Sequence, residues 1–377
     1  MRAKTKILFV TDCLISGGIE RQLVELVTRL DADKFQPHVL YLYGSRANMS
    51  EHFARPLRDS QIPVTGLDLG WTPFDKLQGL RLIVQAVWRI HPDIIHATNY
   101  HANLLTRLGR LFFPAGAKLI GSVRGEYTPK QLFYERLSKR ACSTIVTNSP
   151  HLTAQLTQVA RVDRSKIEEI PNGVDLARFS RPSEAFRPPP SVANASRIIV
   201  SVGRVSEQKS PHLLAEALGI LRARGQLASG TRVLTIGERQ SDEHQRKLEQ
   251  VIARYALQDI IQQIDPAENI EDFYHIADVT VLASLWEGLP NAALESLAAG
   301  RPVIISEAAN AAGVVTQGMN GWVVKTGDVE ALANTLLDVL EMGKPRLASM
   351  ENECRKRASA YSMESMVTRY ETLYGRF

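Results

Sequence analysis

Cysteine is scarce in this chain of 377 residues. Cys13, Cys142 and Cys354 are the only three, and their spacing matches neither a disulfide framework nor a metal-binding pair. A disulfide-stabilised secreted fold is therefore excluded. Cysteine usage of this kind is typical of a reducing compartment, so we expect a cytoplasmic protein.

Long hydrophobic runs are also missing. No stretch approaches the ~18 apolar residues of a membrane-spanning helix. The N-terminal residues include only four consecutive apolar side chains before Thr11 and Asp12, whereas a secretory signal has roughly 7–15. This start instead predicts a β-strand, with Asp12 in the turn that follows it.

The dinucleotide-binding fingerprint is absent as well. Gly17 and Gly18 follow the first predicted strand but do not extend to G-x-G-x-x-G, which disfavours a dehydrogenase. Paired glycines could bring backbone amides close to a ligand, although a tight connection alone also explains them.

The chain does have an ordinary globular composition, with 44% hydrophobic and 23% charged residues. Its length suits two domains of about 180 residues. Short β-branched runs alternate with amphipathic helical patterns, which predicts parallel sheets covered by helices on both faces. We therefore predict an α/β protein with two Rossmann-like, doubly wound parallel-sheet domains that face a central cleft.

Composition also predicts the domain boundaries. Residues 1–180 form the expected N-terminal domain. The proline-rich stretch 181–196 interrupts the alternation and is predicted to be a linker. The alternation resumes in a C-terminal domain at 197–358, and residues 359–377 form a helix that we expect to pack back on the N-terminal domain.

Positive charge gathers in the first half. Residues 1–180 hold 24 Lys and Arg against 16 Asp and Glu, whereas residues 181–377 hold 21 against 24. This asymmetry indicates an anionic partner, with nucleic acid and an anionic membrane surface as the candidates. From charge alone, a merely soluble surface is an equal alternative.

Two glutamates follow a predicted strand of the second domain. Ligands of parallel sheets bind outside the carboxyl ends of the strands, where Glu287 lies. Pro290 then opens a helix whose N-terminus suits a phosphate. Glu295, on that helix, could accept hydrogen bonds from a ribose diol, and Glu287 from a second sugar. For the pair taken alone, a helix-dipole role and a solvated loop acid are the alternatives.

Two cations follow the first strand of the same domain. Arg204 and Lys209 lie five positions apart in a short polar loop before a helix. A planar guanidinium and a flexible ammonium could both reach one diphosphate and stabilise charge on a leaving phosphate. Two exposed basic residues are the alternative.

Taken together, these stretches resemble glycosyltransferase family 4, a family of retaining enzymes with the two-domain GT-B fold. The resemblance covers nearly the whole chain. It shows in "SGGIER", "DIIHATNYHANLLTRLGR", "IPNGVD", "VGRVSEQKS" and "SLWEGLPNAALESLAAGRPVI". The most specific part is the pair of glutamates separated by seven residues, with Gly-Arg and Lys upstream.

The resemblance implies a donor-binding set around a nucleoside diphosphate sugar. The matching positions are Gly17, Gly18, Arg204, Lys209, Glu287, Leu289, Asn291 and Glu295. Among them, Arg204, Lys209 and Glu287 are the catalytic candidates. The implied reaction transfers a sugar with retention at the anomeric carbon, with the leaving phosphate helping to deprotonate the acceptor. The resemblance implies that no cofactor and no metal are needed. The Asp-Ala-Asp triplet at 31–33 is not expected to bind a metal, because it joins a helix to a strand away from the expected site.

One position departs from the family pattern. Many relatives carry a histidine after the strand that matches "KLIGSV", where this chain has Arg124. Arginine stays protonated and cannot act as a base. Arg124 could instead hold a donor-sugar hydroxyl or an acceptor phosphate. His96 is a candidate of the same kind, with a wall residue as the alternative, and His101 opens the following helix.

The resemblance also implies a glycan or lipid-linked acceptor in cell-surface polysaccharide synthesis, and no nucleic-acid partner. Within 125–140, Leu132, Phe133 and Leu137 lie among cations and could rest on an anionic membrane surface, which would place the protein peripherally on the inner face. An ordinary surface helix is the alternative. Other candidate functions are a soluble-acceptor transferase of the sucrose- or trehalose-synthase type and a non-catalytic nucleotide-sugar-binding subunit.

Overall fold

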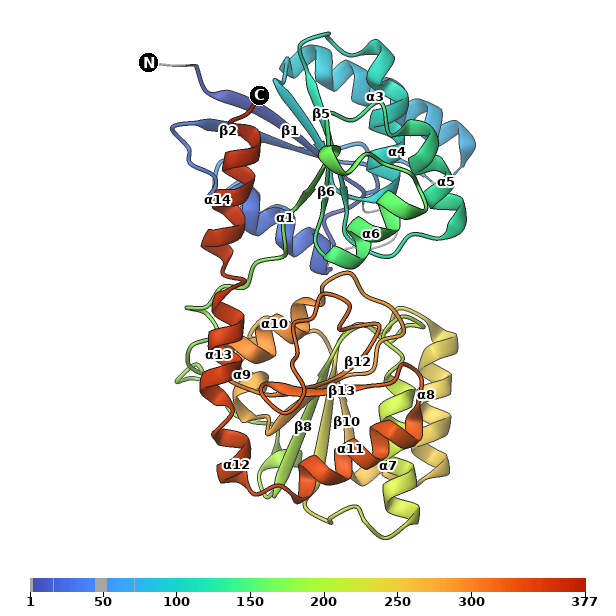
Figure 1. The fold of residues 1–377 in the computed structure, drawn as a ribbon, viewed down its shortest axis with the longest axis vertical. Coiled ribbons are helices and arrows are strands. Elements are labelled where there is room, and N and C mark those ends of the chain that lie inside the picture. The colour runs from blue at the N-terminus through green and yellow to red at the C-terminus, as the bar shows by residue number, and fades with distance from the viewer. Residues whose placement is uncertain (1–2, 16, 45–52, 71) are drawn as a thin grey trace. The chain divides into compact units, whose positions relative to one another are not determined.

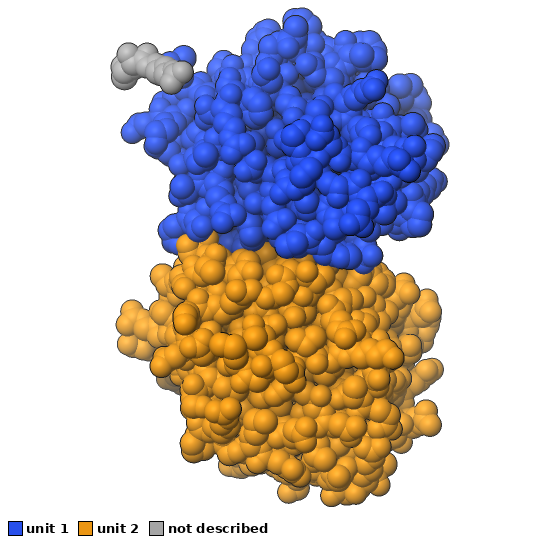
Figure 2. Space-filling model, viewed as in Figure 1, with its two compact units in different colours: residues 1–173, 363–377 blue, residues 174–362 orange. Residues whose placement is uncertain are grey.

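The computed structural model describes residues 3–15, 17–44, 53–70 and 72–377. Two compact units make up the chain, residues 1–173 with 363–377 and residues 174–362 (Figure 2). Each unit contains a parallel sheet and its own hydrophobic core.

The first unit is built on a seven-stranded sheet with strand order β3-β2-β1-β4-β5-β6-β7. Its strands are β1 (Thr5–Thr11), β2 (Phe35–Tyr41), β3 (Val64–Gly66), β4 (Ile94–Ala97), β5 (Lys118–Val123), β6 (Thr144–Thr147) and β7 (Ile167–Glu169). Its helices are α1 (Gly18–Arg29), α2 (Ala54–Asp59), α3 (Pro73–Ile90), α4 (Tyr100–Gly109), α5 (Pro129–Ser138), α6 (Pro150–Gln158) and α14 (Met363–Tyr374), with short 3-10 turns η1 (Arg110–Phe112) and η2 (Arg164–Lys166).

Alternating side chains of the strands divide this core between the two faces of the sheet. Leu8 and Val10 of β1 belong to the cluster under α3 to α6, whereas Ile7 and Phe9 belong to the cluster under α1, α2 and α14. Figure 1 shows α3, α4 and α5 on one side of this sheet, and α1 and α14 on the other. Residues far apart in sequence therefore close one core.

The second unit is built on a six-stranded sheet with strand order β10-β9-β8-β11-β12-β13. Its strands are β8 (Arg197–Val202), β9 (Thr231–Ile236), β10 (Ile261–Ile264), β11 (Val279–Leu282), β12 (Val303–Ser306) and β13 (Gly321–Val324). Its helices are α7 (Pro211–Ala223), α8 (Asp242–Arg254), α9 (Ile270–Ile276), α10 (Asn291–Ala298), α11 (Val329–Glu341), α12 (Lys344–Ala348) and α13 (Glu351–Ser359), with 3-10 turns η3 (Pro190–Val192) and η4 (Leu257–Asp259).

Local sequence signals set several helix starts. Thr72 and Thr128 each form a capping box, with Asp75 and Gln131 respectively, and a proline follows at the first helical position. The missing amide of proline costs no hydrogen bond there. Each strand pairing in the described parts of both sheets is parallel, so the predicted fold class of two Rossmann-like α/β domains is confirmed.

The observed units divide at a different point from the predicted boundary at 180 and the linker at 181–196. The division lies between Gly173 and Val174, and the proline-rich segment belongs to the second unit. Phe179 and Val192 are buried in the second core, and the Ser183 amide donates to Asp272 Oδ1 over 2.6 Å. The segment lacks periodic apolar residues, but a few anchors suffice to hold it.

Strand order gives each sheet one point where the winding reverses. In the first unit this switch point lies between β1 and β4, and in the second between β8 and β11. The loops after those strands lead in opposite directions and leave a crevice at the carboxyl edge. These two positions are where ligand-binding residues are expected.

Candidate functional site

The loop after β8 carries the two predicted cations. Arg204 and Lys209 are both partly exposed. Directly after Lys209, Ser210 takes a left-handed conformation with φ 43° and ψ 52°, and α7 begins at the next residue. Such a conformation costs about 1 kcal/mol or more outside glycine, so the surrounding structure holds this turn in place.

Lys209 forms an ion pair with Glu287, which follows β11 on the other side of the switch point. The side chains are 19% and 9% exposed, so the pair is partly shielded from water. The predicted catalytic residues Lys209 and Glu287 are thus brought together across 78 positions of sequence.

Gln208 connects this pair to Arg204. Its amide nitrogen donates to Glu287 Oε2 over 3.3 Å and to the Trp286 carbonyl over 3.0 Å, and its amide oxygen accepts from Arg204 Nη2 over 3.4 Å. Sequence reasoning missed Gln208. Its position between the two predicted cations was the available signal.

A pocket opens beside these side chains at the carboxyl ends of β8 and β9. Its lining includes Arg204, Lys209 and Arg239 together with Asp265 and Gly237. A Cβ on Gly237, which has φ 152°, would lie 2.1 Å from the carbonyl oxygen of Gly203, so only glycine allows these two backbones to approach. With Glu287, which pairs with Lys209, included, three cations stand against two carboxylates, so a net positive charge remains and favours an anionic ligand.

Helix α10 follows Glu287 and carries the second predicted glutamate. Pro290 is its N-cap, so the helix begins one residue later than expected, and no side chain caps this end. Asn291 begins the helix, and Leu289 is buried just before it. The Tyr274 hydroxyl donates to Glu295 Oε2 over 2.9 Å, so a buried aromatic residue orients Glu295.

In the first unit, Gly17 and Gly18 lie at the start of α1. Gly17 is the N-cap, and a Cβ there would lie 2.1 Å from Oε2 of Glu20. A larger residue at position 17 would therefore require the end of the Glu20 side chain to move. The Glu20 side chain is buried, and its Oε1 accepts from Asn99 Nδ2 over 3.3 Å.

His96 is completely buried. Its Nδ1 is hydrogen-bonded with the Tyr374 hydroxyl over 2.7 Å, and its Nε2 with the Ser122 hydroxyl over 2.8 Å. Burial, and secondly the nearby charge of Arg124, together lower the pKa of His96 to about 3. The structure therefore places His96 in the core, joined to α14.

Arg124 is also mostly buried. Its Nη1 donates to Asn172 Oδ1 over 2.8 Å, and its Nη2 donates to the Tyr370 hydroxyl. The guanidinium carbon lies 5.9 Å from the centre of the Tyr370 ring. In the structure, Arg124 thus connects the end of β5 to α14.

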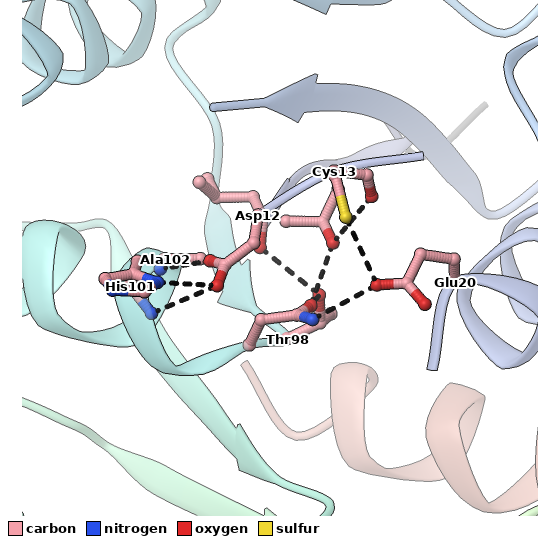
Figure 3. A network of polar contacts seen from close by, with 9 residues as sticks. Asp12, Cys13, Glu20, Thr98, His101 and Ala102 are labelled. Carbon is pink, nitrogen blue, oxygen red and sulfur yellow. Dashed lines mark hydrogen bonds and ion pairs between the residues drawn. The ribbon is translucent and has the colours of Figure 1, made fainter. Parts of the chain in front are cut away.

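A second polar cluster, shown in Figure 3, lies at the switch point of the first sheet. Asp12 follows β1 and accepts from His101 Nδ1 over 3.0 Å and from the Ala102 amide over 2.7 Å. Sequence reasoning assigned Asp12 to a turn and His101 to a helix start. Both residues follow strands that meet at this point, but their pairing could not be seen without the strand order.

Within the described ranges, no group of three or more metal-ligating side chains is gathered. Among the same residues, no helix has the length and apolar character needed to cross a membrane.

Two family models match the chain. Residues 16–178 match the model described as Glycosyltransferase Family 4, and residues 183–359 match the model described as Glycosyl transferases group 1. The two matches meet near the observed division between the compact units.

Individual proteins are similar over much of the chain. WcaL of Escherichia coli strain K12, named as a glycosyltransferase of colanic acid biosynthesis, is 28% identical over 256 residues. This match covers 66% of the present chain but only 59% of that protein.

Solved structures share the whole fold. A glycosyltransferase from Rickettsia africae has a TM-score of 0.82 at 21% identity, and the match covers 100% of this chain and 99% of that one. HepE from Anabaena, solved with UDP-glucose, has a TM-score of 0.81 at 20% identity, with coverage of 98% and 99%. The fold is therefore GT-B.

Proposed function

The chain belongs to glycosyltransferase family 4, and from this premise we propose that it is a retaining enzyme. It moves a sugar from a nucleoside diphosphate donor to a glycan or lipid-linked acceptor in cell-surface polysaccharide synthesis. The observation that carries the proposal is the pocket at the β8–β11 switch point, where Arg204 and Lys209 lie beside Glu287.

Arg204 and Lys209 supply the positive charge that a diphosphate leaving group requires. Arg204 offers a planar fork of donors, and Lys209 a compact ammonium. Both stabilise the negative charge that grows on the β-phosphate as the bond to the sugar breaks. Because these cations provide that charge, the reaction needs no metal ion.

Glu287 has two roles in this proposal. One carboxylate oxygen pairs with Lys209, and the other accepts a hydrogen bond from Gln208. The ammonium and the carboxylate therefore hold each other in position. A carboxylate has about four lone-pair sites. Glu287 can therefore still accept a hydroxyl of the donor sugar, and Glu295, oriented by Tyr274, can accept the ribose.

The donor and the acceptor are inferred from relatives. HepE was solved with UDP and with UDP-glucose, which supports a uridine donor. The name of WcaL supports a polysaccharide acceptor. A partly apolar, basic surface on the first unit supports an anionic membrane as a further partner, with the protein on the inner face.

The test measures UDP binding and turnover in matched variants. We expect UDP to raise the melting temperature of the wild-type protein more than GDP or ADP does. Arg204→Ala and Lys209→Ala each remove a charged contact and should weaken UDP binding about 10–100-fold. In the same two variants, the rate at which UDP is released from a panel of UDP-hexoses should fall by about 10²-fold or more.

Lys247→Ala is the control, because Lys247 is an exposed cation on α8 of the same unit. Arg204→Ala leaves the Lys209–Glu287 pair intact, so a loss of binding there does not reflect an unpaired Glu287. Unchanged UDP affinity in both pocket variants would refute the site. UDP binding without turnover on any sugar donor would instead indicate a non-catalytic subunit, and inversion at the anomeric carbon by NMR would refute retention.

A further inference from the structure

Asp12 and His101, at the switch point of the first sheet, have no role in the proposed donor binding. Asp12 follows β1, and His101 lies on the first turn of α4, which follows β4. Their side chains are 16% and 29% exposed. A partly exposed pair at this edge occupies the place where α/β sheets bind ligands.

Asp12 selects the tautomer of the neutral imidazole. Its Oδ1 accepts from the Ala102 amide, and its Oδ2 accepts from His101 Nδ1 (Figure 3). An ionised carboxylate can only accept, so Nδ1 carries the proton. In the neutral ring, Nε2 is then a hydrogen-bond acceptor.

Two tyrosines fix the plane of the ring. The ring centres of Tyr43 and Tyr100 lie 5.6 and 5.3 Å from that of His101, with interplanar angles of 85° and 69°. These edge-to-face contacts and the bond to Asp12 restrict rotation of the side chain. The imidazole is therefore held in one orientation before any ligand arrives.

The surroundings of the pair favour a neutral ligand. Glu20 lies in the same cluster, where its Oε1 contacts Cys13 Sγ at 3.6 Å and Asn99 Nδ2 at 3.3 Å. Burial and then the charge of Glu20 raise the pKa of the Cys13 thiol to about 12. Two carboxylates at this position oppose a phosphate and suit the hydroxyl groups of a sugar.

A purely structural explanation fits His96 better than His101. His96 has no exposed surface, and both of its nitrogens bond to hydroxyls of the core. Asp12 caps α4 through backbone amides, which any residue at position 101 would supply. The cap therefore does not explain why the side chain at this position is a partly exposed imidazole.

We propose that His101 accepts a hydrogen bond from a hydroxyl of the acceptor sugar, with Asp12 as the positioning residue. This inference rests on the proposed transferase function and deepens it. It assigns the acceptor class as a neutral sugar hydroxyl group presented to the first unit. His101 is a binding and specificity residue, and no proton transfer is assigned to it.

The test uses two substitutions that distinguish the role of Nδ1 from the role of Nε2. The amide of His101→Asn lies near the Nδ1 position and can still reach Asp12, whereas the amide of His101→Gln lies near the Nε2 position. The probes are octyl glycosides of glucose, galactose, mannose and N-acetylglucosamine, and glycerol 3-phosphate serves as the phosphate-bearing comparison. Affinity is measured by ligand-observed NMR in the presence of saturating UDP.

We expect at least one octyl glycoside to bind the wild-type protein, and we expect His101→Asn to lower the affinity for that glycoside about tenfold. His101→Gln should recover part of this affinity, and Asp12→Asn should lower the affinity for the same glycoside. The control is His151→Asn, an exposed histidine on α6 of the same unit, which should bind like the wild type. UDP affinity and melting temperature should be unchanged in both His101 variants.

Glycoside binding that is equal in His101→Asn and the wild type would overturn the inference. It would also be overturned if no glycoside binds, or if glycerol 3-phosphate alone binds. If UDP binds normally in these cases, only this inference fails. Loss of UDP binding in the wild type would instead count against the proposed function itself.

Discussion

His96 is a buried side chain that makes the stability of the first unit depend on pH. Both ring nitrogens bond to hydroxyl groups, and the side chain has no exposed surface. Burial, with Arg124 as a second cause, lowers the pKa of His96 to about 3, against about 6.5 for an unfolded chain. Folding therefore requires the neutral imidazole.

The pH dependence follows from that difference. As the pH falls below about 6.5, the imidazole binds a proton in the unfolded state but stays neutral in the folded state. His96 therefore lowers the free energy of unfolding by up to ~1.4 kcal/mol per pH unit. The loss continues until the pH approaches about 3. His96→Gln, which cannot titrate, should show a shallower decrease between pH 6.5 and 4.5.

Urea unfolding of both proteins across this range measures the difference. Other histidines whose pKa burial lowers, such as His212 and His275, are present in both proteins and cancel in the comparison. Identical pH slopes would show that His96 is not held neutral.

At the scale of the elements, α5 has two chemically different faces. Its inner face carries Glu135, which forms a buried ion pair with Arg107 of α4 at 2.6 Å. Removing either partner of such a pair costs about 3–5 kcal/mol, so this contact fixes the helix. Its outer face exposes Phe133 and Leu137 at 57% and 66%.

Cations lie on and beside α5, and further exposed apolar side chains lie elsewhere on the first unit. Exposed cations on and beside α5 are Lys130, Arg136 and Arg140. Leu111 and Phe112 of η1 are 90% and 58% exposed, and the Phe112 carbonyl accepts from Trp88 Nε1 over 2.9 Å. Apolar side chains with flanking cations suit an anionic lipid surface.

Liposome flotation tests this partner. The wild-type protein should float with vesicles containing anionic lipid at low salt and much less with neutral vesicles. Phe133→Ser with Leu137→Ser removes two insertable side chains, each worth about 1.5–3 kcal/mol when buried, and should reduce binding at least tenfold. Met319→Ser, at a 51% exposed residue of the second unit, is the control. Equal recovery with neutral and anionic vesicles would contradict the membrane proposal.

At the scale of the whole molecule, the chain builds the first unit from both of its ends. After forming the second unit it returns at Met363, and α14 covers the same sheet face as α1. Tyr370 and Tyr374 of α14 are fully buried against this face. The first core is therefore completed only by the last residues.

Tyr374→Ala should destabilise the first unit. The substitution leaves a cavity beside Phe9 and Phe35 and removes the hydroxyl bonded to His96, for an expected loss of about 3–5 kcal/mol. Phe377→Ala changes a 43% exposed side chain close to the same helix and should cost less than about 0.5 kcal/mol.

Two-probe urea denaturation reports this difference, with UDP affinity measured in parallel. The residues that line the pocket of Arg204 and Lys209 belong to the second unit, so UDP should bind Tyr374→Ala at temperatures where that variant is folded. Equal stability of the two variants would show that α14 contributes little to the first core.

Much of this protein is determined by local sequence. Alternating apolar patterns predicted the two parallel-sheet domains, because the periodicity of apolar residues and the branching of side chains determine secondary structure within a single helix or strand. The donor candidates Arg204, Lys209 and Glu287 were identifiable because each follows a predicted strand. Their roles as family positions came from motifs that are continuous in sequence.

Other features were decided only by the tertiary structure. Lys209 meets Glu287 and Asp12 meets His101 because β8 lies beside β11 and β1 beside β4, an order that no local pattern encodes. The burial of His96 likewise depends on Tyr374 of α14, which comes 278 residues later. Periodicity fixes which side of an element is apolar, whereas the choice of neighbour depends on the free energy of packing the whole chain.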